Sequence, residues 1–123
     1  MIIAVASSGQ WLDSIVDSHT GRAACFILYD TDQESHNVID NCRCIECKHW
    51  AGSHMANNLI ETKADVVIVR NIGNNTFRKL TAANINVFYV DDISVAKAIR
   101  RFREGKLSKA KEYNCNGHSH LQK

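Results

Sequence analysis

The sequence contains no proline and only six glycines among its 123 residues. No Pro/Gly-rich linker and no internal repeat divides it, so we expect a single folded domain. No stretch approaches the roughly 20 apolar residues that a membrane-spanning helix needs. The apolar start "MIIAVASSG" lacks the basic leader and the length of a secretory signal, so we expect a cytoplasmic protein with no membrane association.

The chain also lacks a strong charge of either sign, since 15 basic and 13 acidic residues give a formal net charge of +2. This balance does not favour nucleic-acid binding. The basic residues gather in "KAIRRFREGKLSKAKEYN", which we interpret as a solvated helix face in preference to a polyanion site. No G-x-G-x-x-G, Walker or serine-elbow motif occurs, and Asp91-Asp92 is typical of a helix cap. We therefore do not expect an enzyme.

Short β-branched runs alternate with amphipathic stretches along the chain. The turn residues "TDQE" predict a hairpin in the first half, and the strand–helix alternation of the second half predicts parallel strands. The fold class expected is α/β, with a mixed sheet of about five strands and helices on its faces. Strands are predicted at 2–7, 23–30, 35–40, 64–71 and 85–90, and helices at 54–63, 73–84 and 91–107.

Signals for helix ends set the predicted limits of the domain. Asn84 is a plausible stop for one helix and Gly105 for the next, which an Asp or Ser N-cap would open. After Leu107 the periodic pattern disappears. We therefore predict a folded domain over 1–107 and a flexible tail over 108–123.

Five cysteines are many for this length, and three of them form C-x-C-x-x-C at Cys42, Cys44 and Cys47. Thiolates bind zinc, copper(I) and iron–sulfur clusters, and His49, Cys25 or the tail could add a fourth ligand. The spacing departs from paired C-x-x-C zinc sites. A reversible Cys44–Cys47 disulfide and a group without function remain alternatives.

The tail "CNGHSH" carries a second group of metal-ligand residue types, namely Cys115, His118 and His120. Cysteine and two histidines within six residues can converge on a metal. A polar tail could carry the same residues by chance, so this metal role is the less favoured reading.

Two further stretches suit an anionic ligand. The loop "VDSHTGRA" supplies His19, Gly21 and Arg22 between two strands, and Gly73 lies between a strand and a helix. Loops at strand ends commonly bind ligands, and backbone N–H groups at a helix start attract anions. Each signal is weak alone.

The opening strand, the "HTGRA" loop and "ADVVIVRNIGNNTF" together resemble the dinitrogenase iron–molybdenum cofactor-binding family, with its NifX-like, NafY-like and orange-protein-like members. The similarity covers residues 1 to about 107. It implies a ribonuclease H-like three-layer α/β/α fold with a mixed five-stranded sheet. It also implies binding or carriage of a metal–sulfur cluster, with no known catalysis.

The resemblance assigns cofactor-binding roles to matching residues. His19 and Arg22 match the family's His-Phe-Gly-Arg, although Thr20 replaces the phenylalanine. Gly73 and Asn75 match the family's Gly-Gly-Ile-Gly-Pro-Asn-Ala-Phe, whose first glycine and proline are lost here. The Cys42–Cys47 group is not a feature expected throughout the family, although a Cys/His tail recurs in some members.

The leading hypothesis is a carrier or scaffold for an iron–sulfur or molybdenum-containing cluster. Cys42, Cys44 and Cys47 would be the main ligands, completed by His49, His19 or the tail. Its partners would be the donor and acceptor proteins of cofactor assembly, and we expect a monomer or weak dimer. The alternatives are a zinc-stabilised interaction module and a thiol redox protein.

Overall fold

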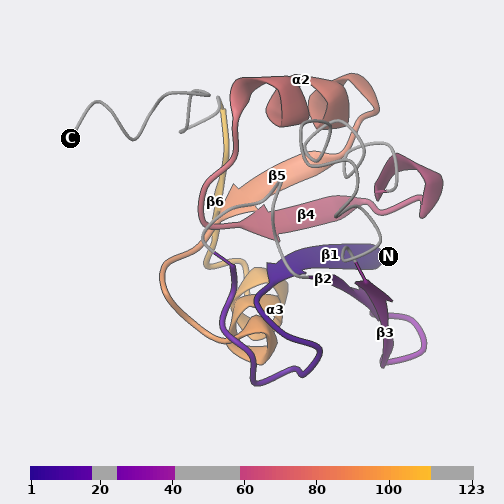
Figure 1. The fold of residues 1–123 in the computed structure, drawn as a ribbon, viewed down its shortest axis with the longest axis vertical. Coiled ribbons are helices and arrows are strands. Elements are labelled where there is room, and N and C mark those ends of the chain that lie inside the picture. Colours follow the sequence, from indigo (N-terminus) through magenta and orange to yellow (C-terminus); the bar gives the residue numbers. More distant parts are fainter. Residues whose placement is uncertain (18–24, 41–58, 112–123) are drawn as a thin grey trace.

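A computed structural model describes residues 1–17, 25–40 and 59–111. The fold is α/β, and Figure 1 shows its elements along the chain. The strands are β1 (Ile2–Ser7), β2 (Cys25–Asp30), β3 (Ser35–Asp40), β4 (Val66–Val69), β5 (Asn86–Tyr89) and β6 (Ser108–Lys109), and the helices are α2 (Asn74–Ala82) and α3 (Val95–Arg103).

The strands form one mixed sheet in the order β3-β2-β1-β4-β5-β6. The predicted hairpin is confirmed, because β2 and β3 pair antiparallel with Asp30 opposite Ser35. The predicted parallel half is confirmed as well, since β1 pairs parallel with β4 and β4 with β5. The three parallel strands therefore end at one edge of the sheet, which we call the carboxyl edge.

Apolar cores on both faces of the sheet hold the strands in place. Side chains alternate along β1, so that Ile3 and Val5 belong to the core under α3, whereas Ala4 and Ala6 belong to the core under α2. Burial on both faces explains the continuous apolar runs of β1 and β4. Figure 1 shows α2 above the sheet and α3 below it.

Local signals set the helix ends as the sequence predicts. Ser94 caps α3 by accepting a hydrogen bond from the Lys97 N–H at 3.2 Å, so serine and not aspartate is the cap. Gly105 follows α3 with φ +74°, and Asn84 follows α2 with φ +64°. At both ends the backbone N–H groups return to carbonyls of the last turn, as in a Schellman motif.

The sequence predicts about five strands, whereas the sheet formed by the described residues has six. The sixth strand, β6, pairs antiparallel with β5 at one side of the sheet and begins directly after the predicted end of the domain at residue 107. Both of its residues are exposed, and only the following Ala110 is buried, so no apolar alternation marks it in the sequence. The ribonuclease H-like class and the flexible tail stay predictions.

Candidate functional site at the carboxyl edge

The carboxyl edge is the end of the sheet where ligands bind in many open α/β folds. Here β1 ends at Ser7, β4 at Val69 and β5 at Tyr89. Since β2 runs antiparallel to β1, it begins at this edge, with Cys25 paired to Ser7. For the same reason β3 ends at this edge, with Asp40 paired to Cys25.

The backbone on both sides of segment 18–24, and on the N-terminal side of segment 41–58, is attached to this edge. The segment 18–24 follows Asp17, whose N–H donates to the Ala6 carbonyl of β1 at 2.9 Å, and precedes Cys25. The segment 41–58 follows directly on Asp40. The residues that flank these segments, Asp17 beside β1, Cys25 of β2 and Asp40 of β3, therefore lie at the same edge of the sheet.

A hydrogen-bonded turn closes the end of β1. The buried Ser7 hydroxyl donates to the Gly9 carbonyl, and the Gly9 N–H donates back to the Ser7 Oγ at 3.2 Å. The Cys25 thiol, 2% exposed, donates to the same carbonyl at 2.9 Å. A thiol that donates a hydrogen bond carries its proton, whereas a metal ligand is a thiolate. In this arrangement the Cys25 thiol supports the turn after β1.

The N-terminus of α2 also lies at the carboxyl edge, directly after β4. Gly73 is its N-cap residue, with no side-chain cap, and the first turn contains no acidic side chain. The positive end of the helix dipole is therefore not offset by a carboxylate within the helix. Gly73 is half-buried and Asn75, in the first turn, is exposed. The predicted helix start after Gly73 is confirmed, and this arrangement favours an anionic group.

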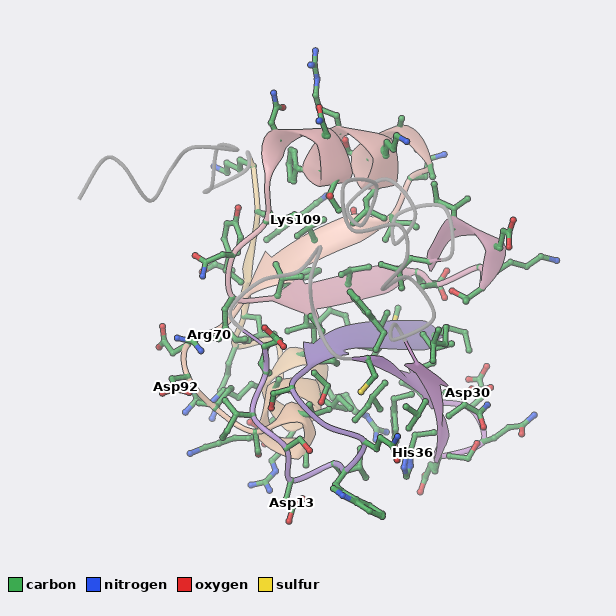
Figure 2. All side chains as sticks on the ribbon, viewed as in Figure 1. Asp13, Asp30, His36, Arg70, Asp92 and Lys109 are labelled. Atoms are coloured by element: carbon green, nitrogen blue, oxygen red, sulfur yellow. The ribbon has the colours of Figure 1, made fainter. Side chains whose placement is uncertain are left out.

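One arginine lies beside this helix start. Arg70 follows β4 directly, and its guanidinium lies 3.8 Å from the carboxylate of Asp92, which follows β5. Figure 2 shows the two side chains approaching each other from these adjacent connections. Asp92 is 72% exposed, so the ion pair is screened by solvent and can exchange partners at low cost.

Most of the predicted ligands lie outside the described residues. This applies to His19, Gly21 and Arg22, to Cys42, Cys44, Cys47 and His49, and to Cys115, His118 and His120. Of the predicted site residues, Gly73, Asn75 and the alternative ligand Cys25 are described. Across 1–17, 25–40 and 59–111, no group of three or more His, Cys, Asp or Glu side chains could hold a metal ion. Within the same ranges no helix has the length and apolarity required to cross a bilayer.

Two residues at this edge, Arg70 and Cys25, have roles that were not predicted from the sequence. Arg70 comes directly after the buried run "VVIV", and a charged residue in that position was a usable signal for the strand end. The support that Cys25 gives to the β1 turn has no comparable signal. It depends on the register that places Cys25 opposite Ser7, which appears only when β1 and β2 pair.

Comparisons with known proteins agree with this architecture. The apo orange protein from Desulfovibrio gigas is 32% identical, with 92% of this chain and 95% of that chain covered and a TM-score of 0.87. A DUF35-family protein from Thermotoga is 25% identical, with 92% and 96% covered and a TM-score of 0.76. A Methanocaldococcus jannaschii protein, 19% identical over 91% and 96% of the chains with a TM-score of 0.69, shows the fold alone. No match was found among curated proteins.

A family model described as dinitrogenase iron-molybdenum cofactor matches residues 1–105. The match includes every described strand except β6, together with α2, α3 and the carboxyl edge. The chain therefore belongs to the dinitrogenase iron–molybdenum cofactor family.

Proposed function

We propose that this protein binds and carries an anionic metal–sulfur cluster at the carboxyl edge, in the assembly or delivery of a metal cofactor. The cluster is cargo, so the protein supplies binding, orientation and release, while the chemistry belongs to the cluster. The observation that carries the proposal is the convergence of Asp17, Cys25 and Asp40 at the edge where α2 begins.

Chain connectivity limits how far the predicted ligands can be from this edge. Two residues of extended chain span at most about 7 Å. The backbone of His19 is therefore held near that of Asp17, and the backbone of Cys42 near that of Asp40. Since Asp17 bonds to β1 and Asp40 pairs with β2, we propose that both segments contribute to one site.

The charges at the edge suit such a cargo. A cluster held by thiolates is anionic, and the uncapped N-terminus of α2 offers a positive dipole end to it. Arg70 adds a cation next to the start of α2, within 3.8 Å of the exposed Asp92 carboxylate. We propose Cys42, Cys44 and Cys47 as the main ligands, with His49, His19 or the tail residues Cys115, His118 and His120 completing the site. Arg22, Gly21 and Asn75 would contact the cargo through polar groups.

The test is anaerobic reconstitution with iron and sulfide, followed by a visible absorption spectrum and metal analysis. We expect sulfur-to-iron charge-transfer bands and bound iron in the parent chain, and their loss in the Cys42→Ser/Cys44→Ser/Cys47→Ser variant. Cys25→Ser is the matched control, because a hydroxyl can keep the hydrogen bond to the Gly9 carbonyl. It should bind as much iron as the parent.

Other outcomes would contradict the carrier function. Stoichiometric zinc with no visible bands would favour a zinc-stabilised interaction module. No bound metal, even after a molybdenum-containing cluster has been supplied, together with a reversible Cys44–Cys47 disulfide, would favour thiol redox chemistry. Equal loss of iron in the Cys25→Ser control would place the ligands elsewhere.

A further inference from the structure

An open groove lies beside α3, on the face of the sheet opposite α2. Its volume is about 370 Å³, and residues from the loop after β1, from β2 and from α3 line it. Tyr29 of the groove pairs with Ile3 near the start of β1, whereas Cys25 pairs with Ser7 at its end. The groove therefore extends from the loop after β1, at Leu12 and Ala96, along α3 towards Tyr29 near the start of β1. Its lining consists of Leu12, Tyr29, Ala96, Ile99, Arg100, Arg103 and Glu104.

The helix contributes one continuous stripe to this groove. Ala96, Ile99, Arg100 and Arg103 follow the spacing i, i+3, i+4, i+7, which places them on one side of α3. The stripe lies next to the core-facing stripe and shares Ile99 with it. Its first half is apolar and its second half is basic. Helix α3 thus presents an apolar floor that ends in two guanidinium groups.

The structure holds one of these arginines in position. The guanidinium of Arg103 donates a hydrogen bond to the Tyr29 hydroxyl at 3.2 Å and lies 5.8 Å from the centre of its ring. Fixing an exposed arginine before binding lowers the entropy that complex formation must overcome. Tyrosine and arginine are also the residue types that dominate binding energy at protein interfaces.

The charge around the groove is positive. Arg100, Arg101 and Arg103 occupy the last turn of α3, and Lys97 is exposed on its first. The carboxylate of Glu104 lies 3.4 Å from the Lys106 ammonium, so its charge is partly neutralised. The basic run interpreted from sequence as a solvated face therefore borders an apolar groove.

We propose that this groove docks a segment of a partner protein in which large apolar side chains stand beside carboxylates. The apolar side chains would cover Leu12, Ala96 and Ile99, and the carboxylates would pair with Arg100 and Arg103. An amphipathic helix laid in a groove is a recurrent mode of recognition. The proposal stands independently of the cluster site, because the groove contains none of the proposed ligands and neither Arg70, Gly73 nor Asn75.

A second copy of this chain fits the groove less well. Among the described residues, besides Asp91-Asp92, whose apolar neighbour Ile93 packs against the core under α3, its acidic segment is the turn from Asp30 to Glu34, with sequence Asp-Thr-Asp-Gln-Glu. This turn contains no large apolar side chain to fill the floor. In addition, the Asp30 carboxylate already accepts the Asp32 N–H at 2.9 Å. Charge complementarity together with the apolar floor therefore favours a different protein.

The test uses a synthetic amphipathic peptide with leucines on one face and glutamates beside them. Binding to the isotope-labelled chain is followed by NMR titration. We expect shifts concentrated at Leu12, Tyr29 and residues 96–104. The Arg100→Glu/Arg103→Glu variant should bind about tenfold more weakly or worse, since each lost charge-assisted hydrogen bond alone approaches that factor.

Two variants separate docking from general charge effects. Arg78→Glu/Lys79→Glu makes the same charge change on α2, including one residue of its last turn, and should leave binding within about twofold of the parent. Ala96→Trp should fill the groove and abolish binding with every arginine kept. A folded amide spectrum of each variant shows that the loss is not unfolding.

Several results would overturn the proposal. One is equal binding of a peptide in which lysine replaces glutamate, or of one in which serine replaces leucine. A second is equal weakening by the α2 variant. A third is a set of groove shifts that grow with the concentration of the chain alone, which would assign the groove to a second copy.

Discussion

Replacing Gly105 with alanine tests the end of α3, which carries both groove arginines. Gly105 has φ +74°, and a Cβ built on it would have no atom within 4 Å. The cost is therefore conformational and not steric. An L-residue in the left-handed region costs about 1–2 kcal/mol, and the lower entropy of the unfolded alanine chain returns about 0.4–1 kcal/mol. We expect a net loss of about 1 kcal/mol in the free energy of unfolding.

Urea denaturation monitored by circular dichroism measures this loss, which corresponds to a Tm lower by about 3–6 °C. Gly105→Asn is the matched control, because asparagine tolerates positive φ, and it should lose less than half as much. Equal stability of parent and alanine variant would refute the reasoning. It would mean that α3 does not end in the left-handed conformation in solution.

Three further predictions test the elements that position the two sites. Leu80→Ala removes a fully buried side chain from the core under α2 and should lower the free energy of unfolding by about 3 kcal/mol, read from the urea midpoint. Ser94→Ala removes the hydroxyl that accepts the Lys97 N–H and should lower the free energy of unfolding by about 1 kcal/mol. Ser94→Gly should lower it by only a few tenths of a kcal/mol. Equal losses in the two variants would show that Ser94 does not cap α3. Arg70→Gln breaks a 3.8 Å ion pair with a largely exposed partner and should change the free energy of unfolding by less than about 0.5 kcal/mol, so a larger loss would assign Arg70 a structural role.

Much of the fold follows from patterns that are local in sequence. The buried runs 2–7 and 66–69 are apolar without alternation because both of their faces are covered, and this pattern predicts central strands. Asn84 and Gly105 mark helix ends through their tolerance of positive φ. The strand β6 escapes prediction because it is a two-residue edge strand, formed by backbone pairing to β5, and has no buried side chain of its own.

One part of the candidate site, the helix start at Gly73, could be predicted from the local sequence. Gly73 stands between a strand and a helix, so its place at a helix start follows from sequence. The groove beside α3 was not predictable in this way. Its arginines are visible in sequence, but the floor also requires Leu12 and Tyr29, which only the packing of the loop and β2 against α3 brings to them.

The positions of the two proposed sites predict that they act independently. The cluster site proposed at the carboxyl edge and the groove beside α3 share no residue, and the groove arginines lie towards Tyr29, opposite the start of β1. Substitutions at distant sites that share no partners usually have additive effects. The triple cysteine variant should therefore bind the acidic peptide as the parent does, and Arg100→Glu/Arg103→Glu should bind as much iron as the parent. Coupling of the two measurements would show that docking and cargo binding share a conformational change.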